Sequence, residues 1–406
     1  MRKFIWLWFT PLMFGQQAVS LSLLDAVRQA LAAHPLLESA NQKIAVARGD
    51  RLQAGLSTNP QLVIQTENLR AHGDPPFRYS RDVDQFAYLQ KTFETAGKRG
   101  LRAEVASYGV RRAELELELL RKQIAARVSA AYWSAAGAKS GYEMLLEAGE
   151  NLHRIIEYHE VRVKEGAMAE ADLLRVRLEG ERMQMSMNQA LLEAERARIQ
   201  LFREMGSSEF PRLALTDRVE TEATPVVADA AASLEQRSEV KIARLEVERG
   251  RSQHRLQQAN SRPDLTALFG LKRTGGMNTM LGAVQVELPF QNRNQGAIAS
   301  AAAEIRMAES SLAAGQALVK AEVQAAGLDY EMRRKQLAGT LAALVKQAEE
   351  GYRIAEAAYR EGGVDLLRLL DAQRVRNEAI STYLRSLTEL RLSRVNLDLA
   401  MGVDPQ

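Results

Sequence analysis

Histidine and glutamate side chains that could bind a metal ion gather at one place in the sequence. His153 and Glu157 lie four residues apart, which puts them on one face of a helix, and His159 and Glu160 follow closely. Two or three ligands without partners that orient them make a poor zinc site. A solvated, charged helix face is the favoured interpretation, so we predict neither a metal site nor a cofactor.

Three methionines, Met183, Met185 and Met187, are the other candidate ligands, here for a soft metal ion. The segment around them carries apolar residues on two opposite flanks. Met183 and Met187 belong to one flank and Met185 to the other. Because methionine fills irregular gaps in packed cores, packing between helices is the favoured role. A helix on the surface of a globule has one apolar stripe, so a helix with two is wedged between neighbours, as in a ring of helices.

The sequence has no catalytic signature. It contains no P-loop, no Gly-x-Ser-x-Gly turn and no His-Glu-x-x-His motif. The formal charge of +3 comes from basic residues spread along the chain, without a cluster that would bind nucleic acid. Cysteine is absent, which excludes disulfides and a lipidated cysteine. We therefore predict a protein that is not an enzyme and has no nucleic-acid partner.

The first 20 residues have the pattern of a secretory signal peptide. Arg2 and Lys3 give a positive start, residues 4–14 form an apolar run, and residues 18–20 are small enough for cleavage. The apolar run is too short to span a bilayer as a helix, and no apolar stretch of about 18 residues follows it. A buried N-terminal helix is the alternative interpretation.

The rest of the sequence predicts long helices and two pairs of strands. Alanine, leucine, glutamate and arginine dominate the composition, which is typical of long helices and coiled coils. Residues 101–164 have only isolated glycines as interruptions. As one helix they would reach on the order of 90 Å, far more than a globular domain needs.

The plan of the chain occurs twice. Landmarks coincide when the first half is shifted by 196 positions, as for Gly166 with Gly362 and Gly206 with Gly402. Several landmarks in one ungapped frame indicate two tandem copies of a unit of about 200 residues. The predicted organisation is a signal peptide at 1–20, a first repeat at 21–206, a linker at 207–232, a second repeat at 233–402 and a C-terminal tail at 403–406.

Near residue 285 the sequence alternates like the wall of a membrane β-barrel. Val284, Val286 and Leu288 are apolar, whereas Gln285 and Glu287 between them are polar, so we expect the first three to face lipid. Each predicted strand has about nine residues, close to the length that a tilted strand needs to cross a bilayer. Four strands cannot close a barrel, because single-chain barrels begin at about eight, so several chains must share one. Small hairpins packed on the helices are the alternative.

Four motifs carry a resemblance to a known family. They are Asn59-Pro60, Gly97-Lys98-Arg99, LPFQNRNQG at residues 288–296 and LLDAQR at residues 369–374. With the signal, the paired strands and the duplicated plan, they make the chain resemble the TolC-like outer-membrane efflux proteins. The Gly-Lys-Arg and Arg-Asn-Gln-Gly motifs are most similar to the branch named for CzcC, which serves cobalt, zinc and cadmium efflux. In that branch an acidic residue more often precedes the arginine, where this sequence has Gln291-Asn292.

The resemblance implies a homotrimer with a fold that is mainly α and has a small β part. Four strands per chain would contribute to one twelve-stranded barrel in the outer membrane, surrounded by its lipid. Duplicated long-helix hairpins would form an α-barrel that extends into the periplasm. Such proteins are passive ducts for export. They dock on a periplasmic adaptor (membrane fusion) protein and an inner-membrane pump, here expected to be of the RND type, and the expected cargo is a heavy-metal cation.

In the family, the turns between paired helices form the periplasmic tip, which gates the tunnel and meets the adaptor. In this sequence the corresponding residues are Glu165, Gly166, Ala167, Met168, Glu361, Gly362, Gly363 and Val364. Asp365 is a candidate for an acidic ring in the pore, because three copies would converge in a trimer. An ordinary aspartate at a helix start is the alternative interpretation of Asp365.

Two further functions remain open at this point. A multidrug efflux channel or a type I protein secretion outlet would have the same fold. A periplasmic coiled-coil scaffold without transport would share the helices, but it would not need the alternating strands.

Overall fold

The computed structural model describes residues 19–70, 76–220 and 225–404. Long helices dominate and a few strands accompany them, which confirms the predicted fold class. The chain divides into two compact units, each made of separated stretches. We call residues 39–119 and 237–318 the sheet unit, and residues 1–38, 120–236 and 319–406 the hairpin unit. Of the predicted signal peptide, all but Val19 and Ser20 lies outside the described residues.

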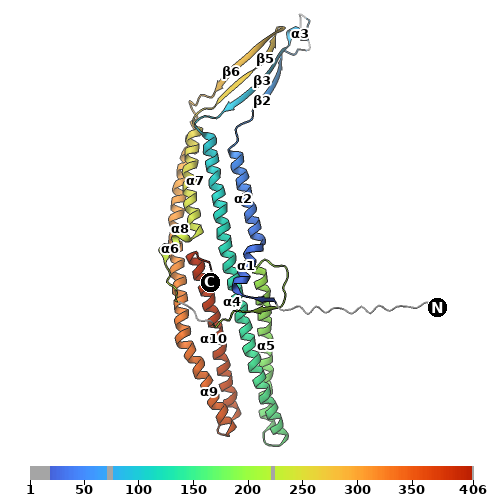
Figure 1. Cartoon of the computed structure of the whole chain (residues 1–406), viewed down its shortest axis with the longest axis vertical. Coiled ribbons are helices and arrows are strands. Elements are labelled where there is room, and N and C mark those ends of the chain that lie inside the picture. The colour runs from blue at the N-terminus through green and yellow to red at the C-terminus, as the bar shows by residue number, and fades with distance from the viewer. Residues whose placement is uncertain (1–18, 71–75, 221–224, 405–406) are drawn as a thin grey trace, which may run out of the picture. The chain divides into compact units, whose positions relative to one another are not determined.

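The sheet unit contains one antiparallel sheet of four strands, paired in the order β2, β3, β5 and β6 (Figure 1). Helices α2 and α7 belong to the same unit, together with the first part of α4 and of α8. The bounds are α2 Pro35–Ala54, β2 Gln61–Glu67, α3 Tyr79–Asp82, β3 Asp84–Phe93, α4 Lys98–Lys164, α7 Ser238–Asn260, β5 Leu265–Thr274, β6 Met277–Val286 and α8 Gln295–Gln336.

Glycine sets the geometry of the sheet at two places. Gly275 and Gly276 join β5 to β6 with φ values of 59° and 81°, as a two-residue hairpin turn with positive φ requires. At Gly270, a Cβ atom would lie 2.2 Å from the carbonyl oxygen of Ala87 and 2.4 Å from the Cβ atom of Tyr88. Any larger residue at position 270 would therefore force β3 and β5 apart.

A buried lysine fixes the junction between β3 and the helix that follows it. The Lys98 ammonium donates to Asp264 Oδ1 and to the carbonyl oxygen of Arg262, both at 2.7 Å. The backbone N–H of Thr95 donates to the same carboxylate at 2.9 Å. Burial alone would raise the pKa of Asp264, but the bonds from Lys98 and Thr95 outweigh it and hold that pKa below its ordinary value. The Gly-Lys-Arg motif thus has a structural role at the start of α4.

The hairpin unit contains two helical hairpins, α4 with α5 and α9 with α10, and a short parallel pair, β1 with β4. A single π-helical segment, η1, separates α8 from α9. The bounds are β1 Val19–Leu21, α1 Leu23–Ala33, α5 Glu170–Glu204, β4 Leu213–Leu215, α6 Ala230–Gln236, η1 Leu337–Leu341, α9 Ala342–Arg360 and α10 Leu366–Met401.

Tyr132 of α4 anchors the N-terminal strand in this unit. Its side chain is fully buried, and its hydroxyl lies 3.0 Å from the carbonyl oxygen of Leu21 and 2.9 Å from Asp217 Oδ2. Burial, as the largest cause, raises the pKa of Tyr132 to about 12. The hydroxyl therefore stays protonated and holds β1 against the segment that follows β4.

Two helical regions are interrupted, and one sequence-based expectation differs from the structure. The first helix ends at Ala33, because Pro35 has no N–H to continue it and instead begins α2. The helical region from Gln295 to Arg360 contains the π-helical segment η1. Leu288 was expected in a strand, but β6 ends at Val286, since its partner β5 begins there and Pro289 follows.

Among the described residues, no helix is long and apolar enough to cross a membrane.

Candidate functional site

The first predicted turn ends α4 with a left-handed residue. Gly166 has a φ of 71°, and the N–H of Ala167 donates to the carbonyl oxygen of Arg162 at 2.8 Å. This bond across five residues, with a left-handed residue at the helix end, is a Schellman ending, and glycine adopts that φ without strain. Glu165, Gly166 and Ala167 are exposed, whereas Met168 is half-buried.

The second predicted turn has the same backbone geometry. Gly362 has a φ of 75°, and the N–H of Gly363 donates to the carbonyl oxygen of Ala358 at 2.8 Å. Glu361, Gly362 and Gly363 are exposed, whereas Val364 is half-buried. All eight residues expected at the turns therefore lie where one helix of a hairpin ends and the next begins. Their contact with an adaptor stays a prediction.

The two turns differ in how the next helix begins. Asp365 is the N-cap of α10, and its Oδ1 accepts from the N–H of Arg368 at 3.0 Å. The N-cap of α5 is Ala169, whose side chain makes no such bond. Asp365 is exposed, so its carboxylate satisfies a free N–H of the helix end while it stays in contact with solvent. The helix-start role is thus visible, and a role in a pore ring remains a prediction.

A small apolar core packs beneath the turns. Leu152 of α4, Val176 of α5 and Leu366 of α10 are buried together, and Met168 packs against them. This core brings three helices from both hairpins into contact close to their turns. The turns are therefore held by buried side chains and are not free loops.

His159 of α4 connects the first hairpin to α9 of the second hairpin. Its side chain is only 1% exposed, and its Nε2 lies 2.6 Å from the hydroxyl oxygen of Tyr359 on α9. The two rings are nearly parallel, with an interplanar angle of 18°. Burial raises the pKa of Tyr359, and the Arg162 guanidinium opposes that rise only in part.

His159 was expected on a charged, solvated helix face, and that interpretation is wrong because the ring is buried. Leu152, Ile155, Ile156 and His159 follow one another at steps of three, one and three residues, which is the spacing of an inward helix face. This spacing could have identified it. His153 and Glu157, by contrast, form an exposed pair at 3.4 Å, with side chains 71% and 65% exposed.

A pocket of about 890 Å³ lies beside His159 and is bordered by aromatic, basic and acidic side chains. Its lining includes Arg154, Arg162 and Arg360, together with Tyr158 and Tyr352. The guanidinium of Arg162 lies 5.7 Å from the centre of the Tyr158 ring. Glu356 and Glu361 line it as well, and Arg360 pairs with Glu356 at 2.8 Å. The pocket therefore presents charges of both signs, and the guanidinium groups of Arg154 and Arg162 are its candidates for binding carboxylate or carbonyl oxygens.

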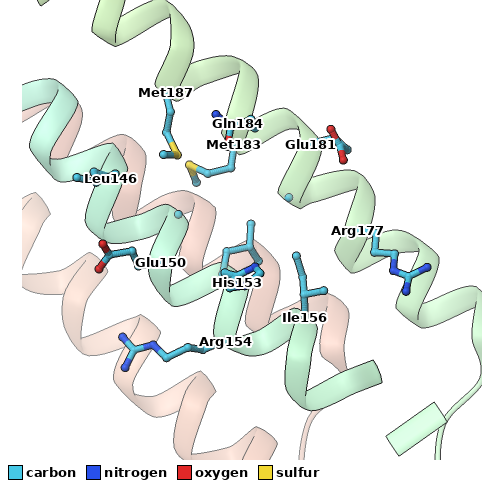
Figure 2. A pocket seen from close by; sticks show the side chains of 13 residues that line it. Leu146, Glu150, His153, Arg154, Ile156, Arg177, Glu181, Met183, Gln184 and Met187 are labelled. Atoms are coloured by element: carbon cyan, nitrogen blue, oxygen red, sulfur yellow. The ribbon is translucent and has the colours of Figure 1, made fainter. Parts of the chain in front are cut away.

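A second pocket, of about 870 Å³, lies between α4 and α5 (Figure 2). In Figure 2, Met183 and Met187 extend from α5 toward the helix that carries Leu146 and Glu150. The sulfur of Met187 lies 2.7 Å from the position that a Cβ atom on Gly149 would take, so this methionine fills the space that the glycine leaves. Among the described residues, no group of three or more His, Cys, Asp or Glu side chains could hold a metal ion.

The two apolar flanks of α5 have different surroundings within the chain. Val176 and Leu201, on one flank, are fully buried. On the other flank, Met185 is 73% exposed. The same exposed flank includes the further residues at seven-residue steps, Leu178, Leu192 and Ile199. One flank therefore packs inside the protein and the other is open to a neighbour.

The strand register separates two faces of the sheet. Val284 pairs with Ala267 and Val286 with Leu265, so both expected lipid-facing residues share one face with β5 residues of the same parity. The large apolar residues on this face are exposed on all four strands. They are Leu62, Ile64, Leu89, Phe93, Leu265, Phe269, Leu271, Met280, Val284 and Val286.

The opposite face of the sheet is more polar. It carries Gln61, Gln65, Gln90, Thr92, Thr266, Lys272, Thr279 and Gln285, with a few half-buried aromatic and aliphatic side chains between them. A soluble sheet buries its apolar face against a core, whereas this sheet exposes it. Exposed patches of this extent mark a surface that meets lipid or another protein.

Comparison with known proteins agrees with this arrangement. Residues 230–403 match the family model described as outer membrane efflux protein. These residues are an outer membrane efflux protein domain. The match confirms the family resemblance that the sequence motifs carry.

The efflux-protein likeness extends beyond this domain to nearly the whole chain. The chain is 23% identical over 398 residues to the cobalt-zinc-cadmium resistance protein CzcC of Cupriavidus metallidurans, and the match covers 97% of this chain and 92% of that protein. This relative belongs to the branch that the Gly-Lys-Arg and Arg-Asn-Gln-Gly motifs resemble.

Solved structures of efflux channels share the fold. The structure of CusC, described for conformational changes accompanying folding and transmembrane channel formation, matches with a TM-score of 0.80 at 16% identity, over 94% of this chain and 92% of that chain. The CmeC outer membrane channel of Campylobacter jejuni matches with a TM-score of 0.79 at 17% identity, over 95% and 86% of the two chains. The chain therefore has the fold of these outer-membrane channels.

Proposed function

We propose that this protein is the outer-membrane channel subunit of a tripartite efflux system, and that it serves as a passive duct for heavy-metal cations. The observation that carries this proposal is the exposed apolar face of a four-stranded sheet, in a chain whose fold is that of outer-membrane channels. Such a face needs lipid, and a duct needs no catalytic residues. The protein acts in the outer membrane and extends into the periplasm.

The assembly is a homotrimer with one shared barrel. In the part of the chain that the structure describes, the two edge strands of the sheet, β2 and β6, have no partner on their outer side. Lipid tolerates no open sheet edge, and four strands are too few for closure, so β2 of one copy pairs with β6 of the next. The exposed flank of α5, with Met185 and its heptad neighbours, packs against a second copy in the α-barrel.

The partners are a periplasmic adaptor and an inner-membrane pump of the RND type. The exposed turn residues, 165–167 and 361–363, meet the adaptor at the tip. The pocket beside His159 offers the guanidinium groups of Arg154 and Arg162 to the same partner. The two predicted repeats, 21–206 and 233–402, each contribute one hairpin and one strand pair.

The cargo is proposed from the likeness to a cobalt-zinc-cadmium resistance protein over nearly the whole chain. The decisive experiment deletes the gene and compares growth in zinc, cobalt and cadmium with growth in detergents and dyes. We expect sensitivity to at least one metal, restored by the wild-type gene. Sensitivity to dyes alone would assign the same channel to multidrug efflux, and loss of a secreted protein would assign it to type I secretion.

A further inference from the structure

Lys91 is a cation within the apolar face of the sheet. In the register of β3, Lys91 pairs with Ala267, which pairs with Val284, one of the residues expected to face lipid. Leu89 and Phe93, two positions before and after Lys91, lie on the same face and are exposed. Lys91 therefore points to the side that the proposed function assigns to lipid.

Among the described residues, no protein group neutralises the charge of Lys91. Within the described parts of the chain, Lys91 has neither an ion pair nor a hydrogen bond from its side chain. Nearby cations are different, because Lys98 pairs with Asp264 at 2.7 Å and Arg102 bonds to Glu94 at 3.0 Å. An unpaired ammonium that faces hydrocarbon is costly, so natural proteins extend it to the interface.

The position of Lys91 along the strand allows its ammonium to reach the membrane interface. It lies two residues from the end of β3 at which the chain continues into α4. One pair of residues advances about 6.8 Å along a strand, which is about 4.8 Å along the membrane normal at a 45° tilt. A lysine side chain reaches about 6 Å, so its ammonium passes the row of Phe93, Leu265 and Val286.

A second cation limits the apolar band at its other end. Arg273 is on the same face, six residues from Ala267 along β5. That separation corresponds to about 14 Å along the membrane normal, and two extended side chains add about 12 Å. The distance between the two charged groups is then about 26 Å, which agrees with the apolar band of about 25 Å in outer-membrane barrels.

We propose that the Lys91 ammonium binds the phosphate of a phospholipid headgroup in the leaflet on the helix side of the sheet, and so fixes the depth of the barrel in the membrane. The proposal rests on the proposed function, because it requires the apolar face to meet lipid. Phosphate offers acceptor oxygens and a negative charge, both of which the ammonium lacks within the protein.

The experiment uses the full-length protein reconstituted in vesicles that contain phosphatidylglycerol, released in mild detergent and examined by native mass spectrometry. We expect Lys91→Leu to reduce the retained phosphatidylglycerol about fivefold, and Lys91→Arg to preserve it. Lys272→Leu is the matched control, because Lys272 is on the opposite face of the same sheet. It should leave lipid retention unchanged.

The outcomes separate this proposal from the proposed function. If the wild-type protein floats with vesicles but Lys91→Leu retains as much phosphatidylglycerol as wild type, the lipid anchor is wrong and the channel assignment stands. If the wild-type protein does not float with vesicles at all, the channel assignment itself is wrong.

Discussion

The imidazole Nε2 of His159 lies 2.6 Å from the hydroxyl oxygen of Tyr359, and this contact joins α4 to α9. The other ring nitrogen, Nδ1, lies 2.7 Å from the carbonyl oxygen of Ile155. A carbonyl oxygen can only accept a hydrogen bond, so Nδ1 carries a hydrogen, and in that tautomer Nε2 accepts from the Tyr359 hydroxyl. Neighbours from two hairpins therefore satisfy both nitrogens of a buried ring.

Removing the Tyr359 hydroxyl should loosen the two hairpins from each other. Tyr359→Phe leaves Nε2 of His159 without a donor in a buried site, which costs about 1 to 3 kcal/mol. We expect faster amide hydrogen exchange in α9 near its end at Arg360. Tyr352→Phe is the matched control, because the structure gives the Tyr352 hydroxyl no partner among the described residues and its ring keeps the contact with Arg376. Equal exchange in both variants would contradict a linking role.

The same substitution should have opposite effects at two glycines of the second hairpin. Gly362→Ala places a side chain at a φ of 75° and should lower the free energy of unfolding by about 1 kcal/mol. Gly351 is inside α9 with open space around it, so Gly351→Ala should raise stability by about 0.5 to 1 kcal/mol. Chemical denaturation checks both values. In a pull-down with the adaptor, Gly362→Ala should lose adaptor binding while the trimer still inserts into the membrane. Unchanged adaptor binding would show that this turn is not part of the adaptor site.

The two faces of the sheet should respond differently to a new charge. Met280 is on the apolar face and 71% exposed, and Thr279 is the adjacent residue on the other face. Met280→Lys should cost about 2 kcal/mol in urea titration of the inserted protein, because the ammonium enters hydrocarbon near the centre of the band. Thr279→Lys should cost little, as an aqueous lumen solvates the charge. Similar losses in both variants would contradict the assignment of the faces.

Charge and capping can be separated at Asp365. Asparagine is as good an N-cap as aspartate, so Asp365→Asn should keep the bond to Arg368 and leave stability unchanged. Asp365→Ala removes the cap and should cost about 1 kcal/mol. If the carboxylate belongs to a pore ring, both variants should change single-channel conductance for divalent cations. A conductance change in the alanine variant alone would mean that Asp365 acts only through the helix.

The bond between Lys98 and Asp264 should make the stability of the sheet unit depend on pH in the acidic range. The folded pKa of Asp264 is lower than its unfolded value, so its contribution is complete above about pH 4 and is lost as pH falls through the folded pKa. Asp264→Asn should therefore lower the urea midpoint at pH 6 and have little effect at pH 2. A loss of the same size at both pH values would show that the carboxylate charge is not what stabilises the junction.

Local sequence signals predicted the helices, the turns and the strand faces well. Gly166 and Gly362 lie where a helix ends and the chain reverses, because few residues other than glycine adopt the positive φ needed there. A glycine at such a position can be recognised from the sequence alone. The alternation of apolar and polar residues around Val284 likewise predicts which residues of that strand share a face. The fold class followed from these signals together with the family motifs.

Contacts between distant segments could not be predicted in the same way. His159 and Tyr359 are 200 residues apart, and the type of one residue does not predict the other as its partner. The π-helical segment at Leu337–Leu341 was not predicted either, because the sequence around Gly339 has no specific signal for it. The position of Lys91 on the apolar face follows from its pairing with Ala267, and the sequence alone does not show that pairing.

The pairing of Val19–Leu21 with Leu213–Leu215 has a consequence for biogenesis. The bond from Leu23 to Asp217 closes a loop of 194 residues, so a chain exported N-terminus first during synthesis waits for its second half. At about 5 to 20 residues per second the wait is on the order of 10 to 40 s. In the exported channel that we propose, Leu21 stays exposed for all of that time. Tyr132, which precedes Asp217 by 85 residues, is exposed for the last part of it. The rate of export, and any chaperone that holds the N-terminal segment, then determine how much of the protein folds before it aggregates.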